Sequence, residues 1–373
     1  MKMLAARELK MLVLAGAATA VAAAPSAAAA MPFLSQSRKI RTVASTVPAS
    51  GPAAGDQNPY GVAVVGRSVG DLVRGDVLVS NFNNARNQQG TGSSIVEVAP
   101  SGKAHVFAVV PQPTLTPAVG LTTALVALRS GFVVVGSLPA PGGMSSAAGA
   151  GALSILNSTG HVVETISGGD INGPWDMTAV DNGSRVVLFV TNVLNGTVAA
   201  NGAVVNKGTV VRIKLSIANG QAPKVLSNRV IATGFGERTD PNALVVGPTG
   251  VGLGERGVLY VADSNGNRIA AIPNALQRTR VQGGGGETVS AGASLNDPLG
   301  LAIAPNGDVI SANGGDGNLV ETAPAGHQVA TKTLVPNGAG DLFGVAIARG
   351  GKGLYFVNDA GSGPAANSLE LLH

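Results

Sequence analysis

Short apolar runs separated by polar turns recur along the whole chain, and this pattern predicts a protein built of β-strands. The runs are short and rich in Val, Ile and Leu, as in 186–190 and 257–262. Runs of about four to eight residues are typical of strands, whereas helices need longer segments with a period near 3.6 residues. Clusters of Gly, Asn, Asp and Ser separate the runs, and the 53 glycines among 373 residues allow tight turns. We therefore expect an all-β protein.

The runs are organised as a repeated unit of four strands. Each unit starts with a triplet resembling Pro-x-Gly and an apolar run, and a second run that ends in a small polar residue follows. The units start 44 to 67 residues apart, at Gly61, Gly120, Asp176, Ala243, Gly300 and Gly344. This repeat predicts a six-bladed β-propeller of four-stranded antiparallel blades. A seventh blade would have to lie in 276–296, where a glycine run favours a loop and an outer strand.

The last unit contains only three runs, so its sheet needs a strand from elsewhere in the chain. Segment 39–47, KIRTVASTV, precedes the first unit and alternates as a strand does. Pairing of this segment with the last blade would close the ring and remove open sheet edges. We expect that closure.

The first 30 residues have the features of a secretory signal peptide. Lys2, Arg7 and Lys10 precede the apolar run 11–24, and three alanines at 28–30 form a small-residue cleavage site. The alternative, an uncleaved anchor, needs a longer apolar core. We expect a signal peptide at 1–30, a single propeller domain at 31–373, and a secreted or periplasmic protein without a transmembrane segment.

Charge and cysteine content exclude several classes of function. The net charge is +4, and removing 1–30 removes three positive charges and one negative charge, which leaves about +2. No Lys/Arg cluster with interleaved aromatic residues is present, so we expect no nucleic-acid partner. The absence of cysteine excludes disulfides and thiolate chemistry.

Two segments carry a resemblance to a known family. Segment 257–269, GVLYVADSNGNRI, resembles the signature of the NHL repeat, and 298–308, PLGLAIAPNGD, is similar to the first half of the same unit. NHL-type repeats resemble those of six-bladed propellers that include the gluconolactonase and senescence-marker group. The resemblance implies the fold, but one fold carries many functions, so it does not fix an activity.

The resemblance also implies where a site would lie. In such propellers the first strand of each blade lines a central channel, and the middle residue of Pro-x-Gly points at the channel mouth. Read in this way, the mouth positions are Tyr60, Val119, Trp175, Asn242, Leu299 and Phe343. Aromatic residues with one amide are typical of a pocket for a small molecule or glycan, and they also suit an apolar plug of the channel. We predict ligand binding at Tyr60, Trp175, Asn242 and Phe343, and both interpretations stay open here.

A metal site is the alternative that the resemblance implies. The gluconolactonase group holds a divalent cation with carboxylate and amide oxygens near these positions. Asn242 matches the amide, Leu299 stands where the group tends to have Asp, and Asp263 could add one carboxylate. Asp263 also belongs to a ring of small polar residues that end the second strands, where bonding to loop backbone is the expected role. His105, His161 and His327 each follow a glycine turn between a third and a fourth strand, which places them on outer strands away from the channel and makes them poor candidates for a catalytic base.

These observations lead to three hypotheses of function. The first is an exported, non-catalytic module that binds a small molecule, glycan or protein at the channel face and needs no cofactor. The second is a metal-dependent hydrolase or lyase of the gluconolactonase-like kind, with a divalent cation such as Ca²⁺ held by Asn242 and Asp263. The third is a structural or interaction protein of the cell envelope.

Overall fold

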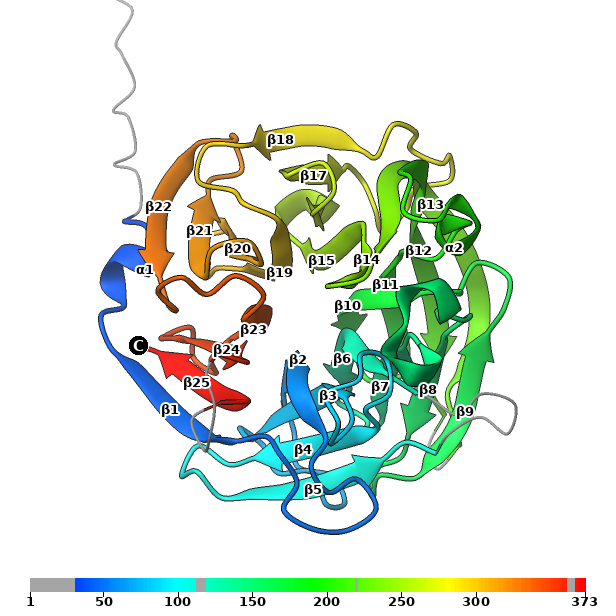
Figure 1. Ribbon diagram of the computed structural model, residues 1–373, viewed down its shortest axis with the longest axis vertical. Helices are drawn as coiled ribbons and strands as arrows, with labels where there is room; N and C mark the ends of the chain where they lie inside the picture. The colour runs from blue at the N-terminus through cyan, green and yellow to red at the C-terminus, as the bar shows by residue number, and fades with distance from the viewer. Residues whose placement is uncertain (1–30, 112–118, 219–220, 361–365) are drawn as a thin grey trace, which may run out of the picture. The chain divides into compact units, whose positions relative to one another are not determined.

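Six antiparallel sheets are arranged around a central channel (Figure 1). The computed structural model describes residues 31–111, 119–218, 221–360 and 366–373. The predicted signal peptide, 1–30, lies outside these residues. The six-bladed β-propeller expected from the repeats is confirmed, and no helix among the described residues is long and apolar enough to cross a membrane.

Each blade has four antiparallel strands that run from the channel outward, and the sheet of blade three carries a fifth, β14 (Leu244–Val246). Blades one and two are formed by β2 (Gln57–Val64), β3 (Val77–Asn83), β4 (Ser94–Val98), β5 (Ala104–Val109), β6 (Leu121–Ala127), β7 (Val133–Ser137), β8 (Ala152–Leu156) and β9 (Val162–Ser167). Blades three and four are formed by β10 (Pro174–Asp181), β11 (Arg185–Asn192), β12 (Val205–Ser216), β13 (Lys224–Asp240), β15 (Pro248–Leu253), β16 (Leu259–Asp263), β17 (Arg268–Ile272) and β18 (Glu287–Ala291).

Blade five contains β19 (Pro298–Ile303), β20 (Val309–Asn313), β21 (Asn318–Thr322) and β22 (Gln328–Thr333). Blade six contains β23 (Leu342–Ile347), β24 (Leu354–Asn358), β25 (Ser368–Leu372) and β1 (Ile40–Ser45). The short helices are α1 (Phe33–Gln36), α2 (Thr197–Ala200) and the 3₁₀ turns η1 (Pro141–Gly143), η2 (Ser145–Ala147) and η3 (Glu255–Gly257). Buried Val, Leu and Ile side chains pack between the faces of neighbouring blades.

The closure of the ring by the N-terminal strand is confirmed. β1 pairs antiparallel with β25, from Ile40 opposite Leu372 to Ser45 opposite Ser368. The preceding helix α1 is held by Glu321 of β21, whose two carboxylate oxygens accept hydrogen bonds from the backbone N–H groups of Phe33 and Leu34 at 2.7 and 2.8 Å. The segment before β1 therefore bonds to blade five, while β1 itself completes blade six.

Two predicted blade starts are wrong. The first strand of blade four begins at Pro248, because β13 is 17 residues long and turns into an extra strand, β14 (Leu244–Val246), which pairs with its end. The predicted triplet at 241–243 lies in that turn. In blade two, Leu121 occupies the place of the proline, since it pairs with Ser137 as Pro59 pairs with Asn81 in blade one.

With this alignment, the third position of the triplet is where neighbouring first strands approach closely. A Cβ atom on Gly300 would lie 2.0 Å from the Phe343 carbonyl oxygen, and one on Gly344 would lie 2.1 Å from that of Tyr60. At these two positions only glycine fits, because the neighbouring backbone leaves no room for a side chain. The full set of third positions is Gly61, Thr123, Asp176, Gly250, Gly300 and Gly344.

Candidate functional site

A cavity of about 250 Å³ lies where the first strands begin, and we call it the mouth cavity. All four residues of the predicted binding set, Tyr60, Trp175, Asn242 and Phe343, line it. They come from blades one, three and six and from the β13–β14 turn. The structure therefore brings the four residues together, and their binding role stays a prediction.

Asn242 lines the mouth cavity from a turn and not from a first strand, which the sequence analysis did not predict. It lies in the turn between β13 and β14, where its backbone N–H donates to Asp240 at 2.8 Å. Its carbonyl oxygen accepts a hydrogen bond from the Gln89 side chain at 2.8 Å, which links this turn to the long loop of blade one. The true middle residue of the blade-four triplet is Thr249, which is 1 % exposed and donates to the Pro298 carbonyl oxygen of the next blade.

The three aromatic residues form a packed layer beneath the mouth cavity. The Tyr60 ring stacks on Phe343 and Phe82 at centroid distances of 4.0 and 4.4 Å and meets Trp175 edge-on at 5.8 Å. Tyr60 and Trp175 are 3 % exposed and Phe343 is 8 % exposed. Most of their surface therefore packs as a plug of the channel, and only a small part of each faces the cavity.

Polar side chains that the sequence analysis did not select form the cavity wall. They are amides at the start of β2, at the end of β3 and in the following loop: Asn58, Asn83, Asn87 and Gln89. Among the described residues, the side-chain oxygens of Asn58, Asn83 and Gln89 are buried and have no hydrogen-bond partner. The sequence signal was the amide-rich segment 81–89, NFNNARNQQ, which spans the end of β3 and the loop that follows it.

Two carboxyl groups complete the wall of the mouth cavity. Burial raises the pKa of Asp359 to about 7, and the nearby Asp341 adds to the rise because two negative charges disfavour each other. Burial also raises the pKa of Asp297, against the opposing effect of Arg238. The cavity thus combines amide oxygens with two carboxyls that hold protons more readily than usual.

Asp263, the second predicted metal ligand, does not line the mouth cavity. Its carboxylate pairs with Arg268 at 2.8 Å and accepts the backbone N–H of Gly266 at 3.0 Å, and the residue is 2 % exposed. Hydrogen bonding to loop backbone is the role expected for the small polar residues that end the second strands. Within the described part of the chain, no group of three or more His, Asp or Glu side chains converges as a metal site would require.

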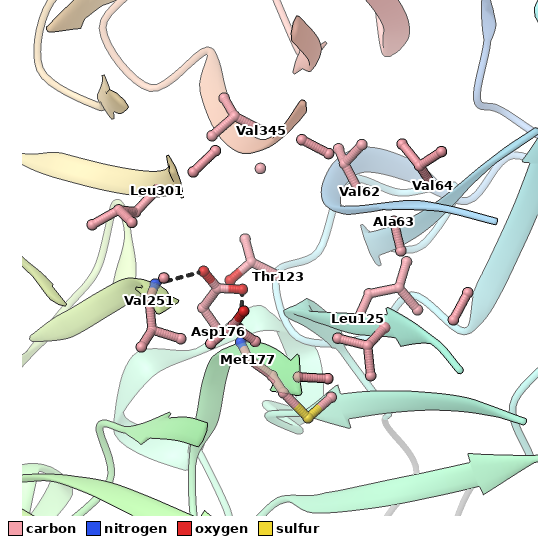
Figure 2. Close-up of a pocket in the computed structure, with 18 of the residues that line it drawn as sticks. Val62, Ala63, Val64, Thr123, Leu125, Asp176, Met177, Val251, Leu301 and Val345 are labelled. Carbon is pink, nitrogen blue, oxygen red and sulfur yellow. Dashed lines mark hydrogen bonds between the residues drawn. The ribbon is translucent and has the colours of Figure 1, made fainter. Parts of the chain in front are cut away.

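A second, larger cavity of about 540 Å³ occupies the channel on the other side of the aromatic layer, and we call it the channel chamber. It is lined by the later parts of the first strands of all six blades. Asp176 projects into it from β10, and its carboxylate accepts the backbone N–H groups of Met177 and Val251 (Figure 2). Burial raises the pKa of Asp176 to about 7. The sequence signal for this residue was an acid where most blades have glycine.

Comparison with solved structures places this fold among known six-bladed propellers. An aldose sugar dehydrogenase from Streptomyces coelicolor, solved with bound PQQ, is 17 % identical over 90 % of this chain and 98 % of its own, with a TM-score of 0.55. A gluconolactonase from Xanthomonas campestris is 11 % identical over 89 % and 88 %, with a TM-score of 0.53. Regucalcin from Agrobacterium tumefaciens, a calcium-binding protein, is 13 % identical over 87 % and 94 %, with a TM-score of 0.52.

No protein-family model matches the chain, and no curated protein matches it. The structural likeness defines a six-bladed propeller of the gluconolactonase kind at the level of fold. At these identities it does not extend to activity.

Proposed function

We propose that the protein is an exported, non-catalytic binding module that takes a small polyhydroxylated ligand, such as a single sugar ring, into the mouth cavity. The basic and apolar segments of 1–30 support export. The single observation that carries the binding proposal is the set of buried amide oxygens without partners on Asn58, Asn83 and Gln89. Buried polar atoms are nearly always hydrogen-bonded, so a ligand that supplies several donors would satisfy them.

The dimensions and composition of the cavity support a small ligand of this class. Its volume of about 250 Å³ is below the ~300–1,000 Å³ typical of pockets for drug-sized molecules. Sugar hydroxyl groups can donate to the amide oxygens and to the carboxylates of Asp297 and Asp359, and they can also accept from the amide N–H groups. The aromatic layer below gives the cavity an apolar floor against which the C–H face of a sugar ring would pack.

A divalent cation is the second candidate, because the cavity wall is rich in oxygen donors. Hard cations such as Ca²⁺ bind carboxylate and amide oxygens, and one solved propeller of similar fold is a calcium-binding regucalcin. The fit is incomplete, since Asp263 is engaged by Arg268 and no three acidic or imidazole groups converge among the described residues. We therefore derive no hydrolytic step through a metal.

The binding proposal is tested with protein recovered from the exported fraction of cells that express the full chain, after its N-terminus has been determined. Thermal shifts are measured with monosaccharides, aldonolactones, Ca²⁺, Mg²⁺ and Mn²⁺. A ligand at about one hundred times its Kd stabilises by roughly 2.7 kcal/mol, which is readily detected. We expect a sugar or sugar acid to stabilise the protein and Asn58→Gly to weaken its binding by about tenfold or more, since each lost buried hydrogen bond costs roughly 1–3 kcal/mol.

Asn337→Gly is the matched control. Both asparagines have positive φ, 58° at Asn58 and 59° at Asn337, so glycine fits either backbone, but Asn337 is exposed and is not among the residues that line the cavity. Equal weakening by both variants, or no stabilisation by any sugar or lactone, would overturn the proposal. Stoichiometric Ca²⁺ uptake that Asn58→Gly abolishes would favour the second candidate, and turnover of a lactone would show that the module is catalytic.

A further inference from the structure

Most side chains that line the channel chamber are apolar, polar backbone atoms share its surface, and the chamber opens at the end of the channel opposite the mouth cavity. The first strands contribute Val62, Leu125, Met177, Leu301 and Val345, whose side chains surround the space (Figure 2). The aromatic layer separates it from the mouth cavity, because Tyr60, Trp175 and Phe343 line only the mouth cavity while later residues of the same strands line the chamber. A ligand would therefore reach the chamber without passing through the mouth cavity.

Asp176 places one carboxylate inside these apolar walls. Four of the six blades have glycine at this position, where the neighbouring first strand leaves no room for a side chain. At blade three the side chain instead extends into the chamber, and one oxygen accepts the Val251 N–H of blade four at 3.0 Å while the other accepts the Met177 N–H at 2.7 Å. A carboxylate has about four acceptor sites, so two backbone donors leave capacity for a ligand.

Few other charged residues line the chamber. Within the described ranges, Arg129 and Asp181 are its only other charged lining residues, and they lie at the end of the strands, where the backbone N–H of Arg129 donates to Asp181. The strands packed against β10 are β6, β7, β11 and β15. Three of these contain no titratable residue, and the one in β11, Arg185, is exposed at the start of that strand. The carboxylate of Asp176 thus has no cationic partner in the described chain.

We propose that the channel chamber is a second ligand site, distinct from the mouth cavity, for a small molecule with an apolar body and a single ammonium group that pairs with Asp176. The apolar walls favour burial of a hydrocarbon or aromatic body. A buried carboxylate without a cation is unfavourable, and an ammonium group supplies both the opposite charge and N–H donors. A neutral ligand of the same shape would gain only the apolar contacts.

Protonation provides an independent signature of this pairing. Burial raises the pKa of Asp176 to about 7, so the carboxyl is largely protonated at pH 6 and largely ionised at pH 8. An aliphatic amine stays protonated over this range, as the lysine side chain does with a pKa near 10.4. Binding should therefore strengthen about tenfold from pH 6 to pH 8, following the ionised fraction of a group that titrates near 7, and it should release protons near pH 7.

The test uses phenethylammonium as the probe and 2-phenylethanol as its neutral isostere, with the full exported protein and titration calorimetry or NMR. At pH 8 we expect wild type to bind the ammonium probe at least tenfold more tightly than the alcohol. Asp176→Asn should remove this preference and the pH dependence. Asp359→Asn, which alters only the mouth cavity, should leave both unchanged.

The outcomes separate this site from the mouth cavity. Equal binding of amine and alcohol by wild type, or a preference that survives in Asp176→Asn, would overturn the proposal. Loss of the preference in Asp359→Asn but not in Asp176→Asn would place the amine in the mouth cavity instead. If Asp176→Asn does not fold, the comparison of the two probes at pH 6 and pH 8 is made in wild type and in Asp359→Asn, because Asp359 of the mouth cavity also titrates near 7. A tenfold change that persists in Asp359→Asn supports the chamber, and its loss there would overturn the proposal.

Discussion

At the scale of single residues, Tyr60 connects the floor of the mouth cavity to the packing of the channel. Its ring contacts Phe82 of its own blade, Trp175 of blade three and Phe343 of blade six. Aromatic pairs of this geometry contribute about 0.5–1.5 kcal/mol each beyond the area they bury. One side chain therefore stabilises contacts among three blades and also shapes the ligand cavity, so function and stability cannot be separated by removing it.

We expect Tyr60→Ala to lower the free energy of unfolding by about 3–5 kcal/mol, because the substitution opens a void in a close-packed layer. Tyr60→Phe keeps the ring and should cost far less, on the order of 1 kcal/mol for the lost hydroxyl. Urea unfolding followed by tryptophan fluorescence measures both, since Trp175 is the only tryptophan and touches Tyr60. Similar losses in the two variants would show that the hydroxyl, and not the stacking, stabilises the layer.

At the scale of strands and blades, the sequence predicted the repeats but not the alignment of every unit. Blades one, three, five and six were aligned correctly because Pro-x-Gly, Pro-Trp-Asp or Leu-Phe-Gly stands directly before an apolar run. Blade two was misaligned because its triplet, Leu121 to Thr123, has neither the proline nor the glycine, and the register of β6 on β7 shifts after Leu121. In blade four the long β13 and its extra strand placed a similar triplet ahead of the true one.

The same alignment explains which site residues were found. Asn242 lines the predicted cavity, but it does so from an inserted turn and not from a first strand. Asp176 was visible in the sequence as the third residue of a triplet. Its significance depends on comparing it with Gly250, Gly300 and Gly344, which requires the correct alignment of all blades. The buried amide oxygens of Asn58 and Asn83, which have no partner in the part of the chain that the structure describes, depend on loop packing, which no local pattern specifies.

Ring closure by β1 makes a prediction at the same scale. A chain that starts at residue 47 lacks β1 and leaves β25 as an open edge. Five residue pairs join the two strands, and at about 1 kcal/mol net per backbone hydrogen bond the loss is on the order of 5 kcal/mol. We expect a Tm lower by about ten degrees or more, together with self-association at high concentration. Calorimetry and light scattering compare this chain with one that starts at Met31.

A synthetic peptide of residues 39–46 provides the control, because it should add back the missing strand. We expect it to raise the Tm of the shortened chain and to leave the chain that starts at Met31 unchanged. A shortened chain that is monomeric and equally stable would contradict the closing role of β1.

At the scale of the whole molecule, buried carboxyl groups set how stability depends on pH. Burial raises the pKa of Asp176, Glu237 and Asp359 to about 7 and that of Asp308 to about 6. Asp240 shifts in the opposite direction, because hydrogen bonds from Asn242 and Arg238 outweigh its burial and lower its pKa. The balance favours the protonated forms, so the native state binds more protons than the unfolded chain between about pH 4 and pH 7.

Stability should therefore be greatest in mildly acidic solution and fall as pH rises through 7. A carboxyl whose pKa is raised on folding stabilises the native state below its ordinary pKa, and this contribution is lost as the pH passes the raised value. For Glu237, which is fully buried and accepts the Asn195 N–H at 2.8 Å, the loss between pH 5 and pH 8 is on the order of 2 kcal/mol at about 1.4 kcal/mol per pKa unit. We expect the Tm of wild type to fall by several degrees over this range.

Glu237→Gln should flatten part of this decline and make the protein more stable than wild type at pH 8, because the buried group can no longer ionise. Glutamine keeps one oxygen to accept the Asn195 N–H. The exposed Glu164→Gln carries the same chemical change on the surface and should leave the decline as it is in wild type. Calorimetry at pH 5, 6, 7 and 8 on the three proteins measures the slopes. A wild-type Tm that rises over this range would show that the buried carboxyls ionise without cost, and identical slopes in wild type and Glu237→Gln would exclude Glu237 as a source of the decline.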